Sequence, residues 1–321
     1  MNKLIALTAT AILAAGLSVE TAFAYGQGDR GTSGAQFLKI APGARPSGMG
    51  EAFAGVADDL HAIYYNPAGL ASLQRVEVTG MHNSHFQGIN YEFAAMSLPL
   101  LVWVNTAKER NAYGVVGMAI YSLSVGGIQR RGVVETDSPV DTFGASDFAY
   151  ALSYAYSIPD TKLSLGAAGK FIDSTIDSTH ASALASDLGA LYRGDGGSVG
   201  AGARNFGTKQ KFNTAADPLP FTLFAGAGYR FSDNWLGSFE VDVARDNRIT
   251  MGLGGEYTRL FTDKLSGALR AGYNSKNTDV GGLSGFSLGL GIGYSNFNFD
   301  FAFVPFGDLG SAYKYSLVVK F

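Results

Sequence analysis

The feature of this chain that most limits its fold is a two-residue alternation of large apolar side chains with small or polar ones, which recurs from residue 74 to the C-terminus. Between Phe286 and Tyr294 every second residue is large and apolar, and the residues between them are glycine or serine. Successive side chains of a β-strand point to opposite faces, so this segment is expected to form a strand with one apolar face. The same alternation runs through residues 148–158, 297–303 and 313–321.

These strands suit a wall that faces lipid on one side. Their apolar faces end in Tyr, Phe or Trp, as in the aromatic girdles of membrane barrels, and a length of about 9–12 residues crosses a bilayer at a tilt. The opposite faces carry charges such as Glu240, Asp242 and Arg270, and also glycine, which a packed soluble core rarely tolerates. Only 16% of the residues are charged, against about a quarter in soluble domains. A soluble β-sandwich is the alternative, because a sheet with one face in water also alternates.

Fourteen segments carry the strand pattern, and the even number agrees with single-chain bacterial barrels. The predicted fold is therefore all-β: a 14-stranded antiparallel transmembrane β-barrel with an N-terminal hatch or plug segment. The strands are expected near residues 74–82, 90–99, 112–124, 147–158, 162–173, 182–193, 197–206, 219–231, 234–243, 249–261, 264–274, 285–294, 297–305 and 312–321.

The connections between the predicted strands differ in length in a regular way. Those that follow even-numbered strands are mostly short, with residues 101–111 as a longer exception. Membrane barrels have short periplasmic turns and long outer loops, so both termini are expected in the periplasm. The longer connections, which follow odd-numbered strands, are residues 125–146, 174–181, 207–218 and 275–284.

The first residues have the pattern of a secretory signal peptide. A basic start at Lys3 is followed by an uncharged apolar run to Leu17 and by a small-x-small cleavage site before Tyr25. No later stretch has about 18 consecutive apolar residues, the length of a transmembrane helix. The location predicted for the chain is the outer membrane of a bacterial cell. The expected domains are a signal peptide at 1–24, a hatch or plug at 25–73 and a barrel at 74–321.

Residues 25–73 do not alternate and contain the sequence Asn66-Pro67-Ala68-Gly69. Pro67 fixes its own φ and pushes Asn66 toward an extended conformation, while Gly69 would let the chain reverse. About fifty residues are too many for a simple tail, and they are too apolar to be disordered. Two interpretations stay open: a plug folded into a glycine-lined lumen, or a periplasmic extension.

No group of side chains points to catalysis, so we expect neither an enzyme nor a cofactor or metal site. His82 and His85 lie near the outer end of the first predicted strand, but no cysteine or clustered carboxylate completes a ligand set. Asp58 and Asp59 are interpreted as a solvated helix end, with a bound cation as the alternative. The net charge of −3 gives no sign of the basic surface that a nucleic-acid-binding protein needs. Charges expected inside the barrel should pair with one another or with the hatch; they are Lys170, Arg230, Glu240, Asp242, Glu256, Arg270 and Asp300.

Two stretches resemble a known family. The sequence FLKIAPGARPSGMGEAFAGVADDLHAIYYNPAGLA at residues 37–71 resembles the N-terminal hatch of the PorV/PorQ-like family, which belongs to the FadL-like group of long-chain fatty-acid transporter barrels. Its Asn66-Pro67-Ala68-Gly69 motif is shared across that group. The sequence FVPFGDLGSAYKYSLVVKF at residues 303–321 resembles the last hairpin of the family.

The resemblance implies a barrel plugged by the hatch. The resemblance to FadL-like members implies passive uptake of hydrophobic small molecules. In such members the molecules leave the barrel through its wall near a kinked third strand, and Gly114 and Gly117 mark the corresponding place in this sequence. PorV-like members imply a role in type IX secretion, with secreted cargo or a translocon as partner. The other implied partners are outer-membrane lipid and the barrel-assembly machinery, which reads the last strand. The assembly signal comprises Tyr313, Tyr315, Leu317, Val319 and Phe321.

Overall fold

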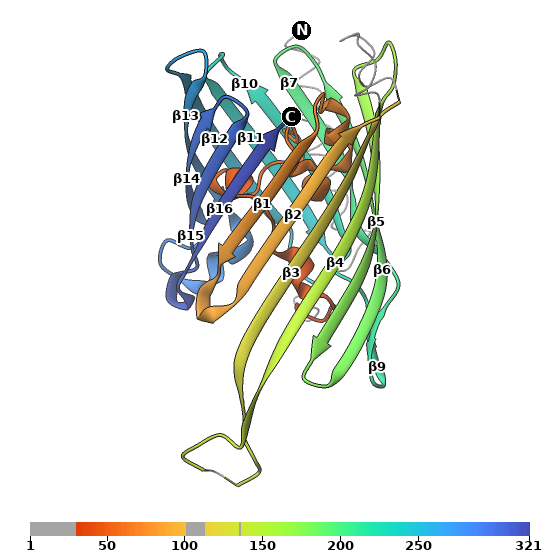
Figure 1. The fold of residues 1–321 in the computed structure, drawn as a ribbon, viewed down its shortest axis with the longest axis vertical. Helices are drawn as coiled ribbons and strands as arrows, with labels where there is room; N and C mark the ends of the chain where they lie inside the picture. The colour runs from red at the N-terminus through yellow and green to blue at the C-terminus, as the bar shows by residue number, and fades with distance from the viewer. Residues whose placement is uncertain (1–29, 101–112, 135) are drawn as a thin grey trace.

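The computed structural model describes residues 30–100, 113–134 and 136–321, and these form one closed antiparallel barrel of fourteen strands (Figure 1). The predicted fold class is confirmed, and the soluble sandwich is excluded because the sheet closes on itself. Closure joins the first strand to the last, from Glu77 opposite Lys320 to Ser84 opposite Tyr313. The predicted signal peptide and the connection at residues 101–111 lie outside the described residues.

Thirteen of the strand pairings in the barrel join strands that are consecutive in the chain, and one more pairs the first barrel strand with the last. The strands are β1 (Glu77–Ser84), β2 (Asn90–Pro99), β3 (Val115–Arg130), β4 (Asp141–Ser157), β5 (Leu163–Ile176), β6 (Thr179–Arg193), β7 (Gly197–Gly207), β10 (Thr222–Arg230), β11 (Trp235–Ala244), β12 (Thr250–Leu260), β13 (Leu265–Asn274), β14 (Phe286–Tyr294), β15 (Phe297–Pro305) and β16 (Ser311–Lys320).

The outer face of the wall is apolar and the inner face is small or polar. In β14, Leu288, Leu290 and Ile292 point outward with 53–59% of their surface exposed, while Ser287 is buried. No water-soluble protein of this kind would leave such a continuous apolar band uncovered, whereas a lipid-facing barrel requires it. The alternation read from the sequence therefore corresponds to a lipid face and a lumen face.

The hairpin β3–β4 is longer than predicted and extends well beyond the neighbouring strands (Figure 1). The expected loop at residues 125–146 is wrong, because β3 continues to Arg130 and β4 begins at Asp141. A register shift between Val125 and Ile128 bends the ribbon. Outside a membrane a strand needs no continuous apolar face, so the alternation that marks the other strands fades here.

The expected loop at residues 207–218 also contains structure. It folds into a small separate hairpin of β8 (Gln210–Phe212) and β9 (Ala215–Asp217). Three other connections at this end of the barrel carry short 3₁₀ helices, η4 (Phe86–Gly88), η5 (Ser275–Val280) and η6 (Gly307–Leu309). The expected loop at residues 174–181 is wrong, because β5 continues to Ile176 and β6 begins at Thr179.

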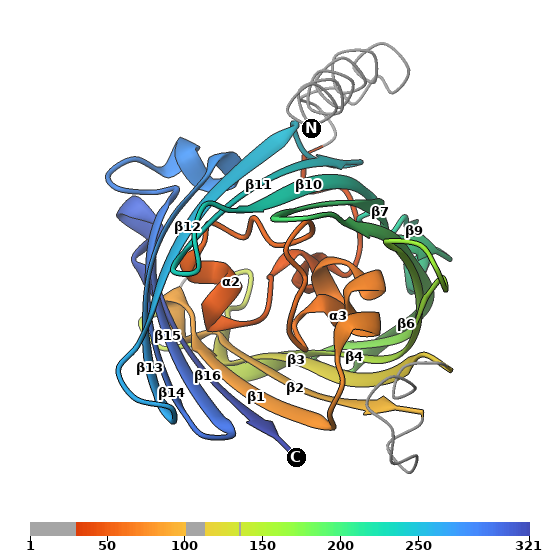
Figure 2. The same cartoon turned by 90° about the horizontal axis from the view of Figure 1, so that it is seen from above.

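Residues 30–73, which we call the hatch, lie inside the barrel (Figure 2). Their short helices are η2 (Gln36–Lys39), α2 (Ala44–Gly48), α3 (Ala62–Tyr65) and η3 (Pro67–Ser72). Phe53, Leu60 and Ile63 of the hatch have no exposed surface, so the hatch forms a packed apolar core together with the inner face of the wall. The described residues include no helix that is long and apolar enough to cross a membrane.

Candidate functional site

Asn66 is the centre of the predicted hatch motif and is completely buried. Its backbone is extended, with φ −160° and ψ 101°, as the following Pro67 requires. The side-chain oxygen accepts a hydrogen bond from the Ala68 amide at 3.2 Å, which caps η3. The side-chain nitrogen donates to the carbonyl of Ala54 at 3.0 Å and to that of Ala190 in β6 at 3.1 Å. One side chain therefore joins two parts of the hatch to the wall.

The glycine of the motif acts through close packing. The expectation that Gly69 reverses the chain is wrong, because it lies within η3 and a Cβ there would overlap the carbonyl oxygen of Ala57. The wall has the same requirement: a Cβ on Gly166 of β5 would overlap the backbone of Pro67 and Ala68. Glycine on the lumen face is thus where the hatch backbone rests directly on the strands.

One side of the hatch is held by charges around Arg45. Its guanidinium donates to Asp58 at 2.6 Å and to Asp59 at 2.8 Å, and it forms two bonds of 2.9 Å with Glu256 of β12. Burial acts to lower the pKa of Arg45, but the three carboxylates hold it well above its usual value. The prediction that Asp58 and Asp59 form a solvated helix end is wrong, since both pair with an arginine inside the lumen.

The network continues into the wall. Glu256 also accepts from Arg270 of β13 at 2.6 Å, and Arg270 donates to Asp300 of β15 at 2.7 Å. Next to them, Lys314 of β16 donates to the carbonyl of Ala41 at 2.8 Å. The prediction that lumen charges pair with one another or with the hatch holds for Glu256, Arg270 and Asp300, and Lys314 is a further lumen charge that was not among those predicted.

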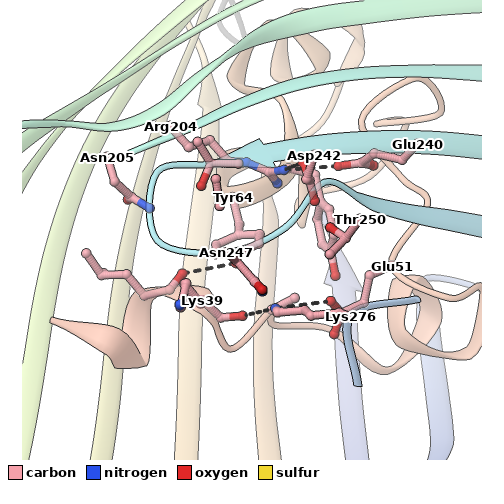
Figure 3. A pocket seen from close by; sticks show the side chains of 15 residues that line it. Lys39, Glu51, Tyr64, Arg204, Asn205, Glu240, Asp242, Asn247, Thr250 and Lys276 are labelled. Carbon is pink, nitrogen blue, oxygen red and sulfur yellow. Dashed lines mark hydrogen bonds and ion pairs between the residues drawn. The ribbon is translucent and has the colours of Figure 1, made fainter. Parts of the chain in front are cut away.

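A second cluster of charged side chains lies where the hatch meets β7 and β11 (Figure 3). Arg204 of β7 pairs with Glu240 and Asp242 of β11, and its guanidinium lies 5.5 Å from the centroid of the Tyr64 ring. Glu240 in turn accepts from the backbone amides of Phe53 and Ala54 at 2.8 and 2.7 Å. The cavity beside this cluster has a volume of only ≈ 40 Å³. That is room for water, whereas a site known to hold benzene measures about 150 Å³.

The opposite side of the lumen, from β2 to β5, is lined mainly by small and aromatic residues, apart from the buried Lys170. Leu70 and Ile63 of the hatch rest on Gly117 of β3, where a Cβ would lie 2.9 and 3.2 Å from their terminal methyl carbons. We call this contact region the apolar seam. Its buried wall residues include Phe93, Ala95, Ala119, Ala149, Ala151, Ala168 and Ile172.

Two tyrosines of the apolar seam carry hydroxyls that lack a hydrogen-bond partner within the described part of the chain. Tyr91 and Tyr121 are buried, and the ring of Tyr121 lies beside those of Phe93 and Tyr64. An unpaired buried hydroxyl costs about 1–3 kcal/mol. A molecule that enters this side and carries one polar atom would offset that cost.

The predicted kink glycines lie within an intact wall. Gly114 has φ +80° directly before β3, and Gly117 faces the lumen within β3. The β2–β3 ladder is continuous from Asn90 opposite Ser124 to Pro99 opposite Val115. The irregularity of β3 falls further along, at the register shift that includes Gly126 and Gly127.

The residues of the proposed assembly signal lie on the outer face of β16. Tyr313, Tyr315 and Leu317 are exposed toward lipid, and Val319 is half-buried. Phe321 follows the strand, is 71% exposed, and donates its backbone amide to the carbonyl of Val76 at 2.9 Å.

The remaining candidate charges are also placed. Lys170 is buried with Asp187 at 2.6 Å, while Arg230 is exposed at the last position of β10. His82 pairs with Glu92 at 2.6 Å on the outer face. His85 follows β1, where burial lowers its pKa to about 4. The described residues hold no group of three metal-ligating side chains.

A closed antiparallel barrel with an apolar outer face and its own N-terminal segment folded inside is a plugged transmembrane β-barrel. Residues 11–173 match a family described as Uncharacterised protein family (UPF0164), which is half of the chain. The chain belongs to this family. A sequence comparison with curated proteins found no match.

Solved structures share the fold at low sequence identity. The Pseudomonas putida toluene transporter TodX has a TM-score of 0.57 and 12% identity, over 87% of this chain and 97% of TodX. The CymD monoaromatic hydrocarbon channel has a TM-score of 0.57 and 14% identity, over 88% of this chain and 97% of CymD. A Pseudomonas aeruginosa FadL homologue has a TM-score of 0.52 and 11% identity, over 85% and 97% of the two chains. The chain thus has the fold of FadL- and TodX-type channels.

Proposed function

We propose that the chain is an outer-membrane protein that lets hydrophobic small molecules pass without an energy source. The proposal includes the signal peptide at 1–24, the periplasmic position of both termini and the role of the N-terminal segment as a plug. The fold shared with toluene and monoaromatic hydrocarbon channels supports the substrate class. The absence of a catalytic pattern in the sequence agrees with transport.

The observation that carries this proposal is the unequal attachment of the hatch to the two sides of the wall. Toward β11–β16 the hatch is held by Arg45, Glu240 and Lys314 through ion pairs and charge-assisted bonds. Toward β2–β5 it is held mainly by apolar contacts such as that of Leu70 on Gly117. Beyond them, Arg193 of β6 donates to the hatch carbonyls of Val56 and Ala57 at 3.0 and 2.8 Å, so β6 belongs to the polar attachment. A hydrophobic molecule can replace an apolar contact with little loss, but it cannot replace an ion pair.

The route therefore follows the apolar seam. The described wall is continuous beside Gly117, and the polar cavity of ≈ 40 Å³ takes water alone. Passage then requires η3 and the end of α3 to move away from β3–β5 while Arg45 keeps the other side of the hatch in place. Ions are not expected to pass through this opening, because its walls are apolar.

The test is a comparison of ion current and probe passage in the purified full chain. In planar bilayers the intact protein should show little ion current, and in vesicles it should still speed the entry of a monoaromatic fluorophore. Removing residues 35–70 should open a large and steady ion pore. A large conductance of the intact protein would contradict the plug, and a closed protein that passes no probe would contradict transport.

The hairpin β3–β4 favours a second candidate, the PorV-like role in secretion. It extends beyond the barrel, and its tip exposes Val133, Val134 and Val140 almost fully. A transporter of small molecules has no need of such a ribbon, whereas a protein partner would cover it. Shortening the hairpin by residues 127–142 should leave probe passage unchanged under the transport proposal. Loss of a co-purifying secreted protein in this variant would favour the secretion role.

A further inference from the structure

The outer wall has a hollow where two small residues lie side by side. One cross-strand row on the lipid face reads Phe299, Leu317, Gly80, Ala94 and Ile120, from β15 through β16, β1 and β2 to β3. The central two have almost no side chain, and a Cβ on Gly80 would have nothing within 4 Å. The outer surface is therefore lower over β1 and β2 than over the strands on either side, by about the thickness of one layer of side chains.

The hollow is open toward lipid and is bounded by side chains on both flanks and along one end. Leu317 and Ile120 stand on either side, about 14 Å apart at the backbone because three strand spacings separate them. The row below it is filled by Val78, Met96 and Met118. Its volume is ≈ 510 Å³, within the range of roughly 300–1,000 Å³ that small-molecule sites occupy.

The end of the hollow nearest the β1–β2 turn is polar. The next row reads Tyr315, His82, Glu92 and Ser122. His82 Nδ1 lies 2.6 Å from a carboxylate oxygen of Glu92, and the His82 ring stacks on Tyr315 with centroids 6.4 Å apart. The second ring nitrogen of His82 and the second oxygen of Glu92 remain for an outside group. Charged side chains on a lipid face are costly unless they are paired, so this pair marks a particular place on the wall.

We propose that this hollow binds one membrane lipid. An acyl chain lies over Gly80 and Ala94, and the lipid head bonds to the polar row. Glu92 can accept from an ammonium group, and a doubly protonated His82, which donates Nδ1–H to Glu92, can also donate Nε2–H to a phosphate or ester oxygen, so the pair complements a head that carries both charges. A helix of about 10–12 Å diameter would not fit between Leu317 and Ile120. This inference rests on the proposed membrane location.

The experiment is native mass spectrometry of the full chain in detergent, titrated with phosphatidylethanolamine and, separately, with phosphatidylglycerol, whose head lacks the amine. One phosphatidylethanolamine per barrel should be retained. Gly80→Leu fills the hollow and should weaken retention about tenfold or more. Ala271→Leu is the matched control, because Ala271 is an exposed, lipid-facing alanine of β13 with no charged pair beside it. It should retain the lipid as the unaltered protein does.

The double variant His82→Phe/Glu92→Leu tests the polar end. It should lose the preference for phosphatidylethanolamine over phosphatidylglycerol. Slower migration after heating in detergent gels reports that each variant is folded, and Ala94→Leu replaces Gly80→Leu if that variant does not fold. Equal lipid retention in the filled and unaltered proteins would overturn the inference, as would a dimer that the filling substitution dissociates. A chain absent from the outer membrane would contradict the proposed function, whereas a barrel found there without bound lipid overturns this inference alone.

Discussion

The two sides of the lumen wall hold the same hatch in different ways. Toward β11–β16 the wall residues Glu256 and Lys314 bond to Arg45 and to the carbonyl of Ala41 of the hatch. Toward β2–β5 the wall is mainly small and aromatic, and Leu70 of the hatch packs against Gly117. Directional, charge-assisted bonds are lost at once when a group moves, whereas apolar contacts can be exchanged for those of another apolar molecule. We infer that the side toward β11–β16, which we call the anchor, holds the hatch in place, whereas the apolar seam can open.

The largest effect is expected at the anchor. Arg45→Ala leaves Asp58, Asp59 and Glu256 without their shared partner, and removing one member of a buried ion-pair group costs about 3–5 kcal/mol. The hatch should loosen as a whole, seen as a lower unfolding temperature and a raised ion current in planar bilayers. Lys162→Ala, which breaks an exposed pair with Asp195, should change neither quantity. An unaltered ion current in Arg45→Ala would show that this side is no anchor.

A smaller effect is expected at the apolar seam. Leu70→Ala removes a completely buried side chain and should cost about 2–5 kcal/mol, depending on how far the contact collapses. Because the ion pairs remain, probe entry into vesicles should rise while ion current stays low. Leu290→Ala, on the lipid face of β14, is the control and should not affect entry. Equal rises in probe entry and ion current would remove the distinction between the two sides.

Asn66 joins two parts of the hatch to β6 by neutral hydrogen bonds, so its loss should have a smaller effect than the two substitutions above. Asn66→Ala leaves the carbonyls of Ala54 and Ala190 and the amide of Ala68 unpaired, at a cost of about 1–3 kcal/mol. Chemical denaturation should show the loss, and hydrogen exchange should rise in η3 before it rises in α2. Simultaneous exchange of both helices would mean that the hatch moves as one body.

Acidification should have the smallest effect. Burial acts to raise the pKa of Asp59, but His61 and Arg45 hold it well below the usual value. A carboxyl whose pKa is depressed on folding adds stability above its unfolded pKa of about 4, and loses it only as the pH falls through the lower folded pKa. Ion current should therefore stay low from pH 7 to pH 5. Opening within that window would mean that groups other than Asp59 control the anchor.

The sequence carries the barrel more clearly than the hatch. Alternation reveals a strand wherever lipid requires an apolar face, as in β14, and it fails in the projecting part of β3–β4, where no lipid acts. The lumen glycines pointed correctly to an inner wall that could accommodate a plug, and Gly166 shows why. The ion pairs of the anchor could not be predicted from local sequence patterns, because Arg45 and Glu256 are 211 residues apart.

Arg204 shows what further signal was present. It shares the inward parity of Gly200 and Gly202 along β7, so it could have been counted among the lumen charges beside Glu240 and Asp242. The packing role of Gly69 could not have been foreseen, because it depends on the carbonyl of Ala57, which only the folded hatch brings close.

The most direct test of an anchored side and an opening side uses two engineered disulfides in a chain that has no cysteine of its own. Cysteines at Ala52 and Gly252 lock the anchored side, where the two Cβ positions are 3.3 Å apart. Cysteines at Leu70 and Gly117 lock the apolar seam, because the methyl carbon of Leu70 reaches to 2.9 Å from the Cβ position of Gly117 and two cysteine sulfurs replace the outer carbons of that side chain. Under oxidation, the seam lock should stop the entry of a monoaromatic probe into vesicles, the anchor lock should leave it unchanged, and a reductant should restore it. Continued entry with the seam locked, or a block with only the anchor locked, would contradict the account.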